Sequence, residues 1–199
     1  TGAAYCNDII AIPCHAMTEA DADYAMAFAI PVNTKGVRQV CRPFRSKISD
    51  LEFPNDRPYR MHTDSLIIFD DVLVPWERVF LCGEWKHAAT MAYNFALIHR
   101  RTGCAYRIPL SEQFVGVGAA IAEYNGISKA PHVKEKLTDL IVYLEVLKSL
   151  SKTACYDFEM RGGVAVPNPI ATHMAKYHFA HNYHDVIKII QDLAGGILI

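Results

Sequence analysis

The first part of the chain alternates short apolar runs with Pro, Gly, Asn and Asp, a pattern typical of strands separated by turns. We expect strands over five apolar stretches, residues 9–12, 24–32, 37–40, 66–69 and 72–74. Alanines weaken the β propensity of the second stretch, but its length and the Pro31-Val32-Asn33 stop still favour a strand. The pattern therefore predicts a β domain over residues 1–85.

From about Trp85 the apolar residues recur every three or four positions, which indicates helices. Four are expected: residues 87–101, Ser111 to a stop at Asn125-Gly126, Pro131 to Gly162-Gly163, and Pro169 to Gly195-Gly196. The third helix carries one apolar stripe, formed by Val133, Leu137, Leu140, Ile141, Leu144 and Leu147. Helices this long suggest a bundle over residues 86–199, and strands followed by helices without alternation favour the α+β class.

Composition and charge exclude several partners. A formal net charge of −1 offers no basic patch for nucleic acid or an anionic membrane, and no apolar run approaches the roughly 20 residues that span a bilayer. The six cysteines are scattered without a C-x-x-C pair, which argues against a zinc knuckle and a disulfide framework. We therefore expect a cytoplasmic protein without a nucleic-acid or membrane partner.

The segment from His99 to Arg107 is unusually rich in chemically active side chains, with an imidazole, three guanidinium groups, a thiol and a phenol. Histidine is a general acid or base near neutral pH, Tyr106 can donate to a developing oxyanion, and arginine suits phosphate or carboxylate. The alternative is a cationic last turn of a helix that complements the macrodipole and leads into a solvated loop. Both interpretations stay open on spacing alone.

The closing segment Gln191-Asp192-Leu193-Ala194-Gly195-Gly196 also has two interpretations. Two glycines at a helix end permit positive φ and let a flat or phosphorylated ligand approach the backbone. A Gly-Gly stop is also a common C-cap. The four histidine and tyrosine residues on the last predicted helix lack a partner at familiar spacing, so we expect no metal site there.

Several stretches together resemble the 4-hydroxyphenylacetate 3-hydroxylase family, whose members share the acyl-CoA dehydrogenase architecture and include 4-hydroxybutyryl-CoA dehydratase. The most specific stretch runs from Phe69 to Phe80. The other matching stretches, in family order, are Thr1-Gly2-Ala3, Ala16 to Asp21, His99-Arg100, Tyr124-Asn125-Gly126, Lys176 to Phe179, and Asp192 to Gly196. The resemblance implies a middle β domain followed by a long-helix bundle, in a fragment that lacks the family's N-terminal helical domain.

The resemblance also implies FAD, shared between the subunits of a homotetramer or another homo-oligomer. The positions that match the family's cofactor-binding residues are Thr1, Gly2, Ala122, Glu123, Tyr124, Asn125, Gln191, Asp192, Gly195 and Gly196. His99, Tyr106 and Arg107 become the candidate catalytic residues, and Cys6 and Asn7 are expected to face a small-molecule substrate.

Two reactions occur in such a family. One branch uses FADH2, supplied by a flavin reductase, to hydroxylate a phenol; the other is a CoA-thioester lyase and isomerase with a [4Fe-4S] cluster. His99 matches the cluster's histidine, but its cysteine position falls on Tyr106, and Cys104 lies two residues early. A phenol does not replace a thiolate as an iron ligand. We therefore favour the monooxygenase with no metal, while the stretch 122–137 looks closer to the dehydratase and keeps that alternative open, with His99 and Cys104 as its ligands.

Overall fold

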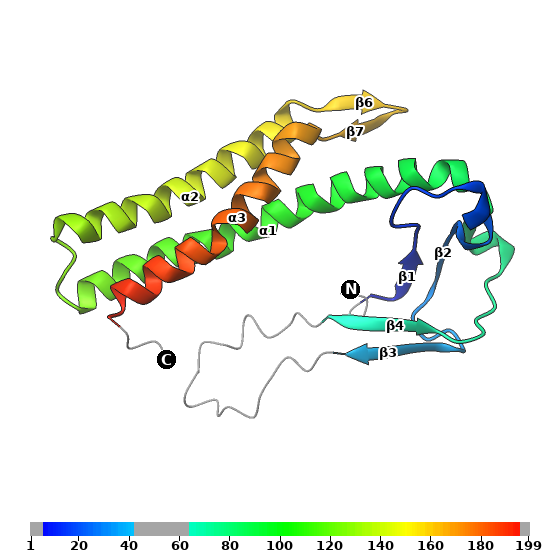
Figure 1. The fold of residues 1–199 in the computed structure, drawn as a ribbon, viewed down its shortest axis with the longest axis horizontal. Coiled ribbons are helices and arrows are strands. Elements are labelled where there is room, and N and C mark those ends of the chain that lie inside the picture. The colour runs from blue at the N-terminus through cyan, green and yellow to red at the C-terminus, as the bar shows by residue number, and fades with distance from the viewer. Residues whose placement is uncertain (1–5, 42–63, 196–199) are drawn as a thin grey trace. The chain divides into compact units, whose positions relative to one another are not determined.

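A computed structural model describes residues 6–41 and 64–195 (Figure 1). The chain divides into two compact units, Thr1–Tyr93 and Asn94–Ile199, which are treated separately below. The domain boundary expected between residues 85 and 86 stays a prediction. Within the described ranges, no helix combines the length and the apolar character needed to cross a bilayer.

The first unit contains two small antiparallel sheets. Strands β1 (Asp8–Ala11), β2 (Met26–Pro31) and β5 (Val79–Cys82) form one sheet in the order β1-β2-β5, and β3 (Val37–Cys41) pairs with β4 (Ser65–Phe69) in the other. Four of the five expected strands are confirmed. The expectation at residues 72–74 was wrong, and the apolar run that forms β5 was missed.

The absence of a strand at residues 72–74 has a local cause. Asp71 takes a positive φ of 50° and Pro75 lacks a backbone N–H, so the short run between them is flanked by two residues that do not suit a strand ladder. Leu73 is exposed. β5, which follows the short 3-10 helix Trp76–Arg78, pairs with β2 instead, and Leu81 packs with Ala25 and Ala27.

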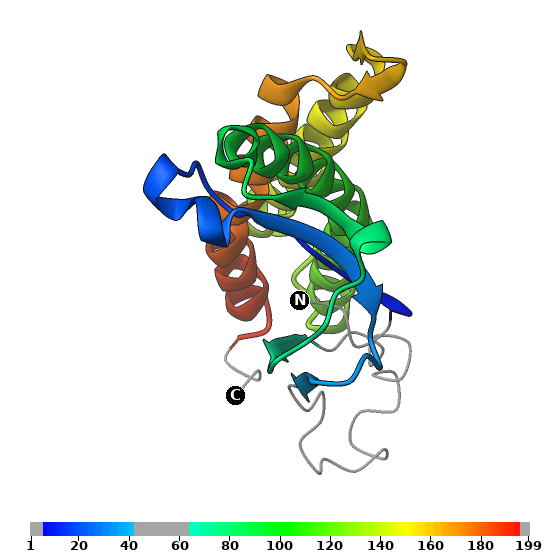
Figure 2. The ribbon, with the colours of Figure 1, turned by 90° about the vertical axis from the view of Figure 1, so that its right-hand side faces the viewer.

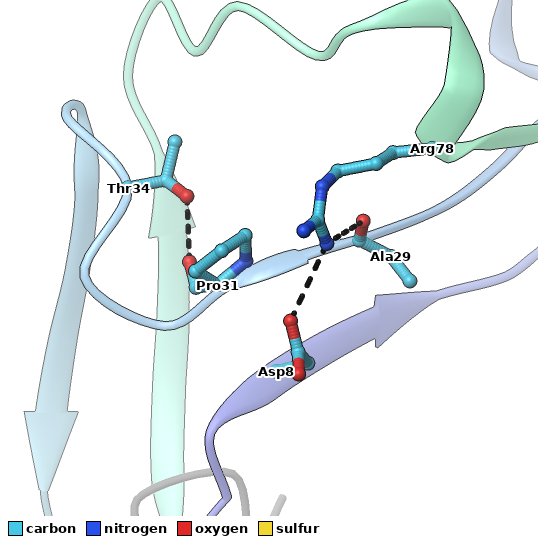
Figure 3. A network of polar contacts seen from close by, with 5 residues as sticks. All are labelled: Asp8, Ala29, Pro31, Thr34 and Arg78. Atoms are coloured by element: carbon cyan, nitrogen blue, oxygen red, sulfur yellow. Dashed lines mark hydrogen bonds and ion pairs between the residues drawn. The ribbon is translucent and has the colours of Figure 1, made fainter.

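Arg78 links the strands of the first sheet (Figure 3). Its Nη1 donates to the Ala29 carbonyl at 3.4 Å and lies 3.5 Å from Asp8 Oδ1, so one side chain contacts both β1 and β2. The turn after β2 is closed by the Thr34 hydroxyl, which donates to the Pro31 carbonyl at 2.7 Å. Because the Arg78–Asp8 pair is solvent-exposed, we expect it to contribute at most about 1 kcal/mol.

Most of the second unit is formed by three long helices, the first of which begins within the last residues of the first unit (Figures 1 and 2). They are α1 (Ala88–Tyr124), α2 (Pro131–Tyr156) and α3 (Pro169–Leu193). The two helices expected at residues 87–101 and 111–125 are one continuous helix, so the predicted break was wrong. Pro109 is exposed, whereas Cys104 and Ser111, which precede and follow it in α1, are buried. The Ser111 hydroxyl donates to the Arg107 carbonyl at 2.9 Å instead of capping a new helix.

A second correction concerns Gly162-Gly163, which was expected to end the third helix. α2 ends at Tyr156, and the glycines form the turn of a hairpin between β6 (Glu159–Arg161) and β7 (Val164–Val166). Both glycines have positive φ, 56° and 82°, which a two-residue hairpin turn of type I′ requires. The strands-then-helices order therefore holds except for this hairpin.

The core of the second unit joins all three helices. Its buried members are Cys104, Leu140, Tyr143, Leu147, Ala175, Phe179, Val186 and Ile190. The predicted α2 stripe is confirmed at Val133, Leu140, Leu144 and Leu147, but Ile141 is exposed because it lies at the edge of the stripe. The Tyr143 hydroxyl donates to the Phe179 carbonyl at 3.0 Å, which fixes α2 against α3.

Tyr143 is expected to make the stability of this unit fall in alkali. Burial raises the pKa of Tyr143 to about 12, whereas an unfolded tyrosine titrates near a pH of about 10. The folded state therefore keeps the proton more tightly: this contribution is complete below a pH of about 10 and is lost as the pH rises from about 10 to about 12.

Tyr143→Phe tests this expectation. The variant should lose about 1 kcal/mol at neutral pH, because the hydrogen bond to Phe179 disappears, but its free energy of unfolding should fall less steeply in alkali. Urea unfolding near neutrality and at a pH of about 11 measures both effects. An equally steep alkaline loss in the two proteins would contradict the role given to Tyr143.

Candidate functional site

The C-terminal ends of α1 and α3 lie together. The Asn125 side-chain amide donates to the Leu193 carbonyl at 3.1 Å. Ala122 and Leu193 are buried in one cluster with Val133 of α2. Residues 122–125 and 191–195, which sequence reasoning assigned to one cofactor, are therefore neighbours in the structure, while their binding role stays a prediction.

The backbone at this end is open. Gly195 has a φ of 65°, and a Cβ atom built on it would meet no described atom within 4 Å. Glu123 and Tyr124, at the end of α1, are exposed. Gly196, like Thr1 and Gly2, lies outside the described residues. The α3 terminus therefore offers bare, accessible backbone of the kind that a nucleotide can approach.

Two lysines that sequence reasoning missed stand next to this terminus. A cavity of about 600 Å³ is lined by Lys136, Asp185, Lys188, Ile189, Gln191 and Asp192. Lys136 forms an ion pair with Asp192, and its hydrogen bond is the main cause that lowers the pKa of that carboxyl. The spacing of Lys188 and Asp192, one turn apart on the predicted helix, was the available signal. The ammonium groups suit the phosphates of a nucleotide.

The candidate catalytic residues lie along α1. His99 stacks on Phe95 with 5.6 Å between ring centroids, and Tyr106 is 58% exposed. The Arg107 guanidinium lies 5.2 Å from the Tyr106 ring centroid and 4.8 Å from that of Phe179. Since His99 and Tyr106 are seven residues apart in one helix, they share a face.

Cys104 is on a different side of the helix. It is five residues from His99, about 140° around the axis, and is only 1% exposed in the helical core. Burial raises the pKa of the Cys104 thiol, which disfavours the thiolate that a metal requires. Among the described residues, no group of three or more His, Cys, Asp and Glu side chains is arranged to hold a metal ion. His99 and Cys104 therefore lie on different sides of α1, and their role as cluster ligands stays a prediction.

Cys6 and Asn7 lie in the first unit, on the segment that leads into β1. Cys6 is exposed, and the Asn7 carbonyl accepts a hydrogen bond from the Val32 amide at 2.9 Å. Their expected contact with substrate stays a prediction.

Comparison with known proteins covers both units. A family profile described as 4-hydroxyphenylacetate 3-hydroxylase N terminal matches residues 1–81, and one described as 4-hydroxyphenylacetate 3-hydroxylase C terminal matches residues 88–199. The oxygenase component of 4-hydroxyphenylacetate 3-monooxygenase from Thermus thermophilus is 32% identical over 97% of this chain and 41% of its own length. The 4-hydroxybutyryl-CoA dehydratase/vinylacetyl-CoA-Delta-isomerase of Clostridium aminobutyricum is 29% identical over 100% of this chain and 42% of its own length.

Solved structures of both kinds of enzyme also align with this chain. An archaeal 4-hydroxybutyryl-CoA dehydratase from N. maritimus aligns with a TM-score of 0.85 and 27% identity over 97% of this chain and 39% of its own. The oxygenase component HpaB complexed with FAD and 4-hydroxyphenylacetate aligns with a TM-score of 0.79 and 31% identity over 94% of this chain and 40% of its own. An acyl-CoA dehydrogenase from Slackia heliotrinireducens, at 21% identity and a TM-score of 0.59 over 86% of this chain and 42% of its own, shares the fold.

The chain thus spans about two fifths of the length of these relatives, and both of its units match. It has an acyl-CoA dehydrogenase-like fold and belongs to the 4-hydroxyphenylacetate 3-hydroxylase family.

Proposed function

We propose that this chain contributes to an FAD-dependent monooxygenase that hydroxylates a phenolic substrate with reduced flavin. The Thermus relative is named as such an oxygenase component, and a relative from Burkholderia cepacia, 30% identical over 98% of this chain, is named an FADH2-dependent monooxygenase. A separate reductase would supply FADH2, and subunits would assemble as a homotetramer or another homo-oligomer.

The observation that carries this proposal is which side chains of α1 share a face with His99. The residue two turns after His99 on the same face is Tyr106, and the nearby thiol of Cys104 is in the core. An iron–sulfur cluster held from this face would need a thiolate where the chain has a phenol. This geometry favours the monooxygenase over the dehydratase and isomerase reaction.

The described residues fit FAD at the end of the helical unit. Gly195 offers open backbone, Asn125 ties α1 to α3, and Lys136 and Lys188 place positive charge beside the cavity. The full set proposed to hold the cofactor is Thr1, Gly2, Ala122, Glu123, Tyr124, Asn125, Gln191, Asp192, Gly195 and Gly196, with Lys136 and Lys188 added. When bound, reduced FAD supplies the reaction with oxygen.

The protein groups would then orient and deprotonate the phenol. A nitrogen of the His99 imidazole accepts the proton of the substrate hydroxyl, and the Tyr106 hydroxyl donates a hydrogen bond to the resulting oxygen. Arg107 places positive charge beside them, held by the rings of Tyr106 and Phe179. Cys6 and Asn7 are proposed to contact the substrate.

Isotope-labelled molecular oxygen tests the proposal. The full-length protein, given chemically reduced FAD and 4-hydroxyphenylacetate or another phenol from a panel, should form a catechol that carries the label. His99→Gln and Tyr106→Phe should lower the rate by about 100-fold or more, the usual size of a general acid–base contribution, while Arg161→Met in the exposed β6–β7 hairpin should not. Dehydration of 4-hydroxybutyryl-CoA without oxygen uptake would instead establish the lyase.

A further inference from the structure

Helices α1 and α3 place several positively charged side chains along their contact. Arg100 Nη1 lies 3.2 Å from His173 Nδ1, and seven residues further along α1 the Arg107 guanidinium lies 4.8 Å from the Phe179 ring centroid. Lys176 is on α3 midway between those two contacts. Positions 173, 176 and 179 follow one another at three-residue steps along α3, and the charges of both Arg107 and Arg100 act on the Lys176 ammonium, so Lys176 is near both guanidinium groups.

The Arg107 guanidinium has a defined place in this row. A Cβ atom on Gly103, one turn earlier, would be 2.9 Å from Arg107 Nη1, so glycine leaves the space that the guanidinium occupies. The rings of Tyr106 and Phe179 contact the same group. Arg107 is thus held in position before any ligand arrives, which lowers the entropy that binding would cost.

The charges in this row have no carboxylate partner among the described residues. The ion pairs of the helical unit use other cations: Lys136 with Asp192, Lys148 with Glu112 and Glu145, and Arg161 with Glu159. Burial and then the charge of Arg107 lower the pKa of Lys176, Cys104 acts in the opposite direction, and the charge of Arg100 adds a further lowering. Arg107 and Lys176 are half-buried and Arg100 is exposed, and three cations this close together repel one another unless an anion joins them.

His173 contributes orientation rather than charge. Burial, and then the Arg100 charge, lower the pKa of His173, so its neutral imidazole can accept a hydrogen bond from Arg100. That contact directs the guanidinium toward α3, where Lys176 lies.

We propose that Arg100, Arg107 and Lys176 form an oxyanion site that binds a carboxylate or phosphate group. Guanidinium groups bind such anions through paired N–H donors, and the ammonium adds a point charge. The inference goes beyond the proposed function, because it assigns a ligand to Arg100 and Lys176 whatever reaction the protein catalyses.

Thermal unfolding of the full-length protein with saturating FAD tests the site, because the added flavin keeps the nucleotide position filled. Potassium chloride is exchanged at constant ionic strength for potassium phosphate or potassium phenylacetate. We expect at least one anion to raise Tm by about 2–4 °C at roughly ten times its Kd. Lys176→Met should abolish that rise, and in chloride its Tm should equal or exceed that of the parent protein, because a repulsion has been removed.

Lys148→Met is the matched control. It removes a lysine that is paired with Glu112 and Glu145, so it should lower Tm in chloride yet keep the full response to the anion. A response to phenylacetate alone identifies an organic carboxylate as ligand, and a response to phosphate alone identifies a phosphate group. The proposal is overturned by no response to either anion, by an unchanged response in Lys176→Met, or by a lower Tm of that variant in chloride, which would reveal a carboxylate partner within the protein.

Discussion

Gly195→Val is expected to weaken FAD binding by about 100-fold or more in the full-length protein, the equivalent of about 2.7 kcal/mol. Gly195 has a positive φ and faces open space at the end of α3, where the proposal places the nucleotide. A valine would both strain the backbone and fill part of that space. Titration of flavin fluorescence against the protein gives the dissociation constant.

Gly162→Val is the control that separates the effect of backbone strain from the effect of filling the open space at Gly195. Gly162 has a similar φ, 56° against 65°, and its added Cβ would also meet no described atom within 4 Å, but it lies in the β6–β7 turn. The control should therefore lose stability to a similar extent while it keeps its affinity for FAD. Equal affinities in the two variants would remove Gly195 from the cofactor site.

Leu147→Ala is expected to destabilise the helical unit by about 2–5 kcal/mol. Leu147 is 0% exposed and belongs to the buried cluster that joins α2 to Cys104 of α1 and Phe179 of α3. The substitution removes apolar contacts and leaves a cavity where three helices meet. Urea unfolding followed by far-ultraviolet circular dichroism measures the loss.

Val142→Ala on the same helix is the control. Its side chain is 52% exposed, so the free energy of unfolding should change by about 0.5 kcal/mol or less. Similar losses at both positions would mean that α2 does not face the core as described.

The elements with strong local signals were predictable. β1 to β4 follow from short apolar runs that end at turn residues, and α2 and α3 begin at Pro131 and Pro169 as expected. Asn168 caps α3, its side-chain oxygen accepting a hydrogen bond from the Ala171 amide at 2.9 Å. The continuity of α1 through Pro109 was not predictable, because it depends on packing that a local pattern does not contain. Gly162-Gly163 fits a helix stop and a hairpin turn equally well, and only the pairing of β6 with β7 decides between them.

The wrong break in α1 also hid the geometry of the candidate site. Two separate helices have no fixed rotational relation, so the sequence left Cys104 open as a partner of His99. One continuous helix places Tyr106 on the His99 face and turns Cys104 into the core. Lys136 and Lys188 were missed for a related reason: the role of a surface lysine depends on which neighbouring helix end it meets.

We infer that this chain serves flavin chemistry without an iron–sulfur cluster. The most direct measurement is the flavin, iron and sulfide content of the full-length protein, purified without air and supplied with FAD. We expect one FAD per subunit with iron and sulfide near zero. About four iron atoms and four sulfides per subunit would contradict it and establish the dehydratase-like site.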